Sequence, residues 1–250
     1  MRARGGGRLL KWLVLVAVGV LAVTALPVLL LRFVAPPTSA FMLEAALEAR
    51  QTHERNYRTE YEWVDLEAIS PNAALAVVAS EDQLFPFHAG FDLKSIREAV
   101  RENAHRRHPR GASTISQQVA KNLFLWSGPS YVRKGLEAWL TVLIEACWPK
   151  ERILEVYLNI AEFGRGIYGV EAASRRFFHH PAARLTRGEA ALLAAVLPSP
   201  RRLHAERPSS YLSSRQEWIL AQMKSLGGAS YLEEIDSRPS PELAHGHPGH

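Results

Sequence analysis

The sequence predicts a mostly α-helical protein in which one transmembrane helix precedes a single helical domain. Trp12–Leu31 is apolar and free of charge, and it has about the 20 residues that a helix needs to cross a bilayer. Beyond it, apolar residues recur at three- and four-residue spacing in one segment after another, which is the period of an amphipathic helix. The chain has 250 residues, 47% of them hydrophobic, which is enough for one sizeable core.

Charge and cysteine content exclude two classes of protein. The formal net charge is +5, but five basic residues precede the first acidic residue, Glu44, and the other 25 basic residues equal the 25 acidic residues in number. The body of the protein is therefore neutral, and we expect no nucleic acid among its partners. Cys147 is the single cysteine, so the chain has no internal disulfide.

The flanks of the apolar segment predict its orientation. Residues 1–11 are basic, so the positive-inside rule places the N-terminus in the cytoplasm and the domain on the other side of the membrane. A cleaved signal peptide is the alternative, because 37–40 offers small residues, but the apolar run is longer than a signal peptide's core. We expect a cytoplasmic N-terminus at 1–11, a transmembrane helix at 12–31, a spacer at 32–40, the domain at 41–230 and a disordered tail, rich in Pro, Gly and His, at 237–250.

The first candidate site follows a buried helix. Ser70 and Pro71 predict a helix start, and Ala73–Ala79 is almost wholly apolar. Glu81 then lies at the C-terminal end, where the negative pole of the helix dipole and partial burial both raise the pKa of a carboxyl group and suit it to acid/base work. The alternative is that Glu81 and Asp82 are solvated charges past a helix end.

A second candidate stretch, Gly111–Phe124, also has helical period. Ile115, Val119 and Leu123 stack on one face of the predicted helix. The opposite face carries hydroxyl and amide groups and one ammonium, from Thr114, Gln117, Gln118 and Lys121. These groups suit sugar hydroxyls and phosphate oxygens, because amides both donate and accept hydrogen bonds and Lys offers a compact positive charge.

Two further stretches of the sequence contain basic residues that could bind an anion. Ser130 can cap a long helix at 131–148, on which Arg133, Lys134 and Glu137 share a face. The alternative for that face is an ordinary ion pair between Arg133 and Glu137. The basic run at 105–110 suggests a mobile loop beside a polyanion site, with a solvated loop as the alternative.

The rest of the domain predicts scaffold. Lys150–Asn159 is amphipathic, and Thr186 with Glu189 forms a capping box for a buried helix at 188–197. Three glycines at 164–169 have the spacing of a dinucleotide fingerprint, but no βαβ unit surrounds them, so we expect a tight loop before a helix at 170–178. One more amphipathic helix is predicted at 211–226.

Four stretches in this order, Glu81–Asp92, Gly111–Phe124, Arg133–Glu137 and Lys150–Asn159, resemble the motif series of glycosyltransferase family 51, the peptidoglycan polymerases. The similarity runs from about Trp12 to Gly228. Because the remaining chain lacks room for a penicillin-binding domain with its Ser-x-x-Lys and Lys-Thr-Gly signatures, we expect the monofunctional form of the family.

The resemblance implies a lysozyme-like glycosyltransferase domain in the periplasm, held by a single-pass helix in a bacterial inner membrane, with a small membrane-facing jaw lobe. It implies lipid II and the growing glycan chain as substrates and no organic cofactor. In the family's reaction the 4-hydroxyl of an acceptor GlcNAc attacks the anomeric carbon of the lipid-linked donor MurNAc. The product is a β-1,4 linkage, and undecaprenyl pyrophosphate is released. Other cell-wall synthesis or division proteins are conceivable partners.

The resemblance also implies residue roles. Glu81 matches the catalytic glutamate, the general base. Glu137 matches a second catalytic glutamate that positions the pyrophosphate, with a divalent cation such as Mg²⁺ as a candidate ligand. A further set of side chains is expected to contact substrate, and its three cations would offset the charge of the leaving pyrophosphate. The set is Asp82, Phe85, His88, Ser113, Thr114, Gln117, Gln118, Lys121, Asn122, Arg133 and Lys134.

One position departs from the family's pattern, since Pro129 stands where many members carry Arg. The work of that Arg would fall to Arg133 or to the basic run at 106–110. Two other functions remain open. A lysozyme-like hydrolase or lytic transglycosylase would also use a pair of glutamates, but it would not need the cations. A non-catalytic, membrane-tethered scaffold for cell-wall enzymes would leave the amide and ammonium face without a purpose.

Overall fold

The computed structural model describes residues 4–103 and 113–236, which fall into two units that divide between Ala35 and Pro36. The first unit contains α1 (Arg4–Leu31), an unbroken helix with Pro27 inside it. Its segment Lys11–Leu31 has a mean hydropathy of 2.8 and is long and apolar enough to cross a membrane. The candidate transmembrane helix expected from the sequence is therefore present.

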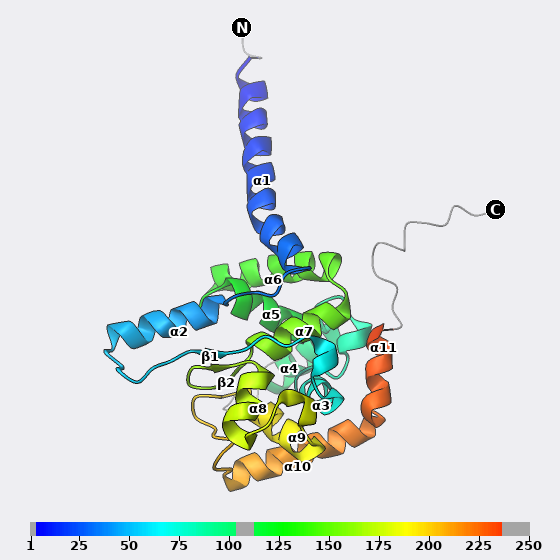
Figure 1. Cartoon of the computed structure of the whole chain (residues 1–250). Helices are drawn as coiled ribbons and strands as arrows, with labels where there is room; N and C mark the ends of the chain where they lie inside the picture. The colour runs from blue at the N-terminus through cyan, green and yellow to red at the C-terminus, as the bar shows by residue number, and fades with distance from the viewer. Residues whose placement is uncertain (1–3, 104–112, 237–250) are drawn as a thin grey trace, which may run out of the picture. The chain divides into compact units, whose positions relative to one another are not determined.

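The second unit is mostly helical, as predicted (Figure 1). Its α-helices are α2 (Ala40–Gln51), α3 (Pro71–Glu81), α4 (Leu93–Asn103), α5 (Ile115–Phe124), α6 (Tyr131–Cys147), α7 (Lys150–Ile160), α8 (Val170–Phe178), α9 (Arg187–Val196), α10 (Ser210–Ser225) and α11 (Glu233–Asp236). Single 3₁₀ turns occur at Leu66–Ala68, Phe85–Phe87, Ala182–Arg184 and Gly228–Leu232.

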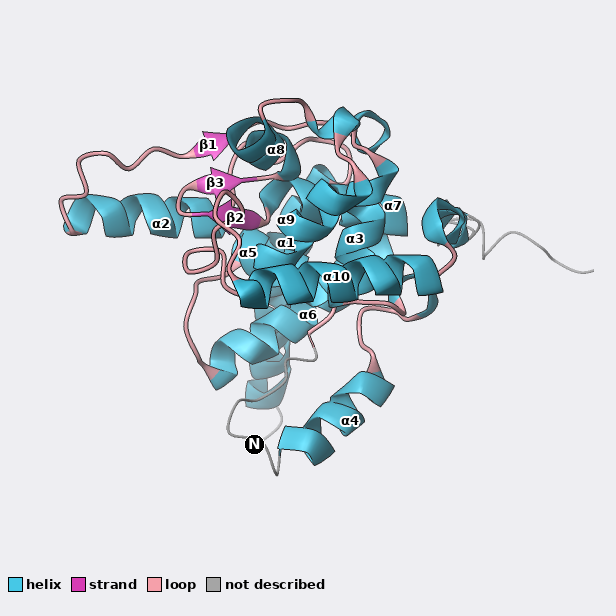
Figure 2. Cartoon of the chain, turned by 90° about the horizontal axis from the view of Figure 1, so that it is seen from below, coloured by secondary structure: helices cyan, strands magenta, loops and turns pink. Residues whose placement is uncertain are grey.

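Two groups of helices form the core. At one end of the unit α3, α9 and α10 pack on one another, and at the other α5 packs on α6 and α7 (Figure 1, Figure 2). Ala73–Ala79 of α3 and Ala190–Val196 of α9 are buried at every position, so small side chains allow the two helices to approach closely. The predicted caps are present, with Ser70 accepting from the Asn72 amide and Thr186 forming a capping box with Glu189.

A small sheet was not predicted from the sequence. It has the order β1-β3-β2, with β1 (Glu60–Tyr61) parallel to β3 (Ile167–Tyr168) and β2 (Glu162–Gly164) antiparallel to β3. Strands of two or three residues are too short to show an alternating pattern. The expected glycine loop does lead into α8: Gly169 has φ +84°, and a Cβ there would lie 2.6 Å from the Asn159 carbonyl oxygen.

The predicted start of α5 was wrong by four residues. The helix begins at Ile115, because Thr114 is its N-cap and forms a capping box with Gln117. The predicted basic loop at 105–110 and the predicted tail at 237–250 lie outside the described residues.

Candidate active site

Glu81 is the last residue of α3, and its side chain stays partly exposed although the helix before it is buried. Burial raises the pKa of Glu81, which is the direction predicted from the sequence. A hydrogen bond from Gln118 and the positive charges of Arg215 and Lys121 act in the opposite direction. The carboxylate therefore sits in an environment that favours proton uptake without an ion-pair partner in direct contact among the described residues.

The amide of Gln118 holds the Glu81 carboxylate in place. Its Nε2 donates to Glu81 Oε2 at 2.9 Å, and its Oε1 accepts from the Tyr157 hydroxyl at 3.2 Å. Because Tyr157 can donate only to the amide oxygen, it fixes which end of the amide faces Glu81. Side chains of α3, α5 and α7 thus converge on one carboxylate. Sequence analysis had assigned Tyr157 to the scaffold, and its position in an amphipathic helix gave no other signal.

Asp82 fastens the loop after α3 to the start of α5. It is buried, and it accepts from the Ile115 amide at 3.0 Å and faces His88 Nε2 at 2.8 Å. The Gly90 amide donates to His88 Nδ1 at 3.1 Å, so the proton of a neutral ring is on Nε2 and points to Asp82. The Thr114 hydroxyl closes this cluster by donating to the Gly90 carbonyl at 2.7 Å.

Several side chains that were expected to contact substrate are therefore occupied within the protein. Phe85 is fully buried, and the Lys150 ammonium lies 4.5 Å from its ring centroid. Gln117 is buried and accepts from the Thr114 amide at 3.0 Å, so it does not share an open face with Gln118. Phe85, Gln117 and the Asp82 cluster are therefore part of the packed surroundings of α3 and α5. Ser113, in contrast, is exposed.

Lys121 links Glu81 to the predicted cationic face of α6. Its ammonium lies 5.5 Å from the centroid of the Phe41 ring, and burial lowers its pKa. The charges of Glu137, Arg133, Lys134 and Glu81 all act on the pKa of Lys121, so the five groups lie within electrostatic reach of one another.

Glu137 is buried and carries two ion pairs. Arg133 Nη1 lies 2.8 Å from its Oε2, and Lys134 Nζ pairs with its Oε1. The ordinary ion pair considered as an alternative is thus present, together with a second cation. Two positive charges on one carboxylate leave a surplus of one, to which Lys121 adds another. The structure brings these four residues together as a cationic cluster.

Two cavities border the Glu81–Gln118 pair. One, of about 470 Å³, is lined by Glu81 and Asp82 together with Asp92, Glu98, Trp218 and Gln222. The other, of about 390 Å³, is lined by Gln118, Lys121 and Asn122 together with Phe41, Ser127 and Arg201. Asn122 also lines the second cavity, and its Oδ1 atom is buried and has no hydrogen-bond partner among the described residues.

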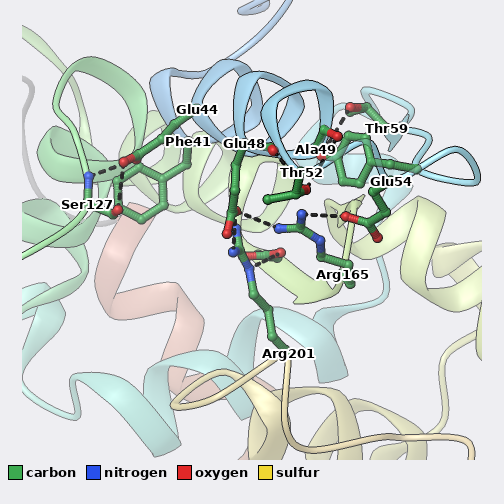
Figure 3. A network of polar contacts seen from close by, with 12 residues as sticks. Phe41, Glu44, Glu48, Ala49, Thr52, Glu54, Thr59, Ser127, Arg165 and Arg201 are labelled. Carbon is green, nitrogen blue, oxygen red and sulfur yellow. Dashed lines mark hydrogen bonds and ion pairs between the residues drawn. The ribbon is translucent and has the colours of Figure 1, made fainter.

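A network of polar contacts joins α2 to segments far from it in the chain (Figure 3), and its members Glu44, Ser127 and Arg201 also line the second cavity. Glu44 accepts from the Ser127 amide at 2.8 Å and from its hydroxyl at 2.7 Å. Glu48 pairs with Arg165 at 2.8 Å and with Arg201 at 2.9 Å, and Arg165 lowers the pKa of Glu48. Sequence analysis did not assign α2, Ser127 or Arg201 to the site, because each contact joins segments that are far apart in the chain.

Fold and site together define a class of protein. It is a helical domain that sets a partly buried, hydrogen-bonded carboxylate near a cluster of cations, in a chain that also carries a helix able to cross a membrane. Residues 48–224 match the family model described as Transglycosylase. The chain belongs to the transglycosylase family, which confirms the family expected from its motif series.

Similar proteins cover most of the chain. It is 52% identical over 230 residues to a biosynthetic peptidoglycan transglycosylase of Xanthomonas campestris pv. campestris (strain B100), covering 92% of this chain and 94% of the relative. It is 54% identical over 210 residues to a protein of the same name from Xylella fastidiosa (strain M23), covering 84% and 86%. The corresponding protein of Pectobacterium carotovorum subsp. carotovorum (strain PC1) is 52% identical over 238 residues, covering 92% and 96%.

Proposed function

We propose that this chain polymerises lipid II into the glycan strands of peptidoglycan, with release of undecaprenyl pyrophosphate. The observation that carries the proposal is the carboxylate of Glu81, hydrogen-bonded by Gln118 and within electrostatic reach of Lys121, in a member of the transglycosylase family. One group can take a proton from a sugar hydroxyl while the other meets an anionic leaving group.

Glu81 is the proposed general base. It takes the proton of the acceptor GlcNAc 4-hydroxyl as that oxygen bonds to the anomeric carbon of the donor MurNAc. The bond from that carbon to the phosphate oxygen breaks, and its electron pair leaves with the pyrophosphate. Attack opposite the leaving group inverts the α-linkage to β-1,4. Burial raises the pKa of Glu81, which makes its carboxylate a stronger base than an exposed glutamate.

Lys121, Arg133 and Lys134 are the proposed electrostatic partners of the departing pyrophosphate. Arg133 can also replace the charge that is missing at Pro129, where many members of the family carry Arg. Its Nε donates to the Gly128 carbonyl at 2.8 Å, so the guanidinium lies against the turn that contains Pro129. We infer that Arg133 supplies the positive charge that many relatives place one residue before Ser130.

The Glu137 carboxylate does not fit a resident metal ion. Each of its oxygens already faces a cation, and the described residues contain no group of three or more His, Cys, Asp or Glu side chains that could hold a metal ion. We therefore assign Glu137 the role of holding Arg133 and Lys134 in place, and the mechanism assigns no step to Mg²⁺.

The location follows from the substrate and from α1. We propose that α1 anchors the chain in the bacterial inner membrane with residues 1–11 in the cytoplasm and the domain in the periplasm. Substrate and enzyme are then held at the same membrane. Protease added outside spheroplasts should degrade the domain. Protection of the domain, or a mature protein that begins near Phe41, would contradict this topology.

The deciding experiment gives radiolabelled lipid II to the detergent-solubilised full-length protein. A polymerase makes glycan strands that a muramidase digests, and Glu81→Gln abolishes their formation. A hydrolase instead shortens preformed glycan, and a scaffold does neither. The cations of α5 and α6 favour polymerisation, because a pyrophosphate leaving group needs positive charge and a neutral sugar leaving group does not.

A further inference from the structure

Arg215 is a cation whose surroundings do not explain its position. It lies on α10, and its guanidinium carbon is 5.6 Å from the centroid of the Trp218 ring. Its Nε is buried and has no hydrogen-bond partner among the described residues. A buried donor without a partner is unfavourable, and cations inside proteins are normally paired. The side chain is half-buried and lies over the Trp218 ring, so only its Nε is both enclosed and without a partner.

The packing of α10 directs this charge to the end of α3. Gln83 Nε2 donates to Gln222 Oε1 at 3.1 Å, which joins α10 to the residue two positions after Glu81. The same nitrogen donates to the Ala79 carbonyl of α3 at 3.0 Å. Trp218 and Gln222 of α10 line one cavity with Glu81, so the α10 face that carries Arg215 borders the carboxylate.

The charge of Arg215 is felt at Glu81. It lowers the pKa of the carboxyl and so opposes the larger effect of burial. Several other groups surround Glu81 or line its cavity. The charged and titratable ones are Asp82, Asp92, Lys94, Glu98, Lys121, Tyr157 and Arg215, and Gln118 contributes its amide. The Tyr231 hydroxyl, from the 3₁₀ turn that packs on α3, donates to the Gln83 carbonyl and lies within electrostatic reach of Asp82.

We propose that Arg215 is a positioning residue for Glu81: its guanidinium stacks on Trp218, its Nε has no partner among the described residues, and from α10 it supplies positive charge that favours the ionised carboxylate between turnovers. Lys121 lies within electrostatic reach of Glu137 and is the proposed partner of the leaving pyrophosphate, whereas no anion is in ion-pair contact with Arg215 among the described residues. The inference rests on the proposed role of Glu81 as general base.

The first test measures the pH dependence of lipid II polymerisation for Arg215→Met, Arg215→Lys and the exposed control Arg207→Met. Loss of the charge should move the acidic limb of the Arg215→Met profile to higher pH. If the limb moves by one pH unit, the rate at an acidic pH falls roughly tenfold, and it recovers at alkaline pH. Arg215→Lys should keep most of the original limb, and Arg207→Met should match the wild type. A lower plateau with an unmoved limb would show that Arg215 acts on structure alone and would overturn the inference.

A second test needs no activity and separates this inference from the proposed function. Thermal unfolding at pH 7 is measured for Glu81→Gln in the wild-type and Arg215→Met backgrounds, as a double-mutant cycle. Replacing the carboxylate should stabilise the protein more where the cation is missing. Equal shifts in both backgrounds would refute the coupling even if polymerisation is observed. If the cycle shows coupling but lipid II is not polymerised, the proposed function fails and the electrostatic pair stands.

Discussion

Glu81 and Glu137 are two glutamates of one domain in opposite surroundings. Glu81 accepts a hydrogen bond from the neutral amide of Gln118, whereas Glu137 pairs with Arg133 and with Lys134. Burial raises the pKa of Glu81, which suits the proposed role of proton acceptor. Each oxygen of Glu137 faces a cation, and we propose that this carboxylate holds positive charge in place. The contrast shows how one fold gives two carboxylates different chemistry.

The largest expected effect comes from removing the base. Glu81→Gln should lower the rate of lipid II polymerisation by about 10²–10⁴-fold, the usual contribution of a general base. The exposed control Glu206→Gln should stay within about twofold of the wild type, the scatter expected of a surface change. If Glu81→Gln retained more than a tenth of the rate while Glu137→Gln lost all of it, the two roles would have to be exchanged.

The second-largest effect is expected from removing the positive charge of Lys121. Lys121→Met should lower kcat by about 10²–10³-fold, because a charge on the leaving group is no longer offset. Lys121→Arg should recover part of the loss, since the charge is kept but its geometry changes. The exposed Lys224→Met serves as control. A change in KM alone would mean that Lys121 binds substrate and transition state equally, which contradicts the leaving-group role.

A smaller effect is expected from the residue that orients Gln118. Tyr157→Phe removes the donor to the Gln118 carbonyl oxygen, a hydrogen bond worth about 1 kcal/mol, so the rate should fall about fivefold with the fold intact. Tyr211→Phe, at an exposed tyrosine, is the matched control. An unchanged rate in Tyr157→Phe would show that Glu81 keeps its position without this contact.

The smallest expected effect is on stability, and its sign follows from the pKa of Glu81. Because the folded pKa is raised, the stability contributed by this group is present below its unfolded pKa and is lost as pH rises through the folded pKa. Glu81→Gln should therefore raise Tm at pH 7 by about 2–4 °C, which corresponds to roughly 1 kcal/mol for a domain of this size. The gain should shrink as pH falls toward 4. A lower Tm at pH 7 would contradict a desolvated carboxylate.

Local sequence patterns predicted the helices well and the uses of their side chains less well. The Ser70–Pro71 start placed Glu81 at the end of α3, and the predicted direction of its pKa shift is confirmed, with burial as the largest cause. The face assigned to Gln117 was wrong, although the Thr-x-x-Gln spacing of a capping box was a signal that could have located it. No local pattern could show that Asp82 accepts from the Ile115 amide, because that contact joins residues 33 positions apart.

By itself the sequence determined the helix able to cross a membrane, the order of the helices, the family and the place of Glu81 at the end of α3. Each of these depends on apolar period, caps or residue order, which are properties of neighbouring positions. Only the tertiary structure decided that Tyr157 orients Gln118, that two cations occupy Glu137 and that the charge of Arg215 reaches Glu81. Burial and the pairing of charges depend on which helices pack together. That packing depends on residues from the whole chain, so no single segment encodes it.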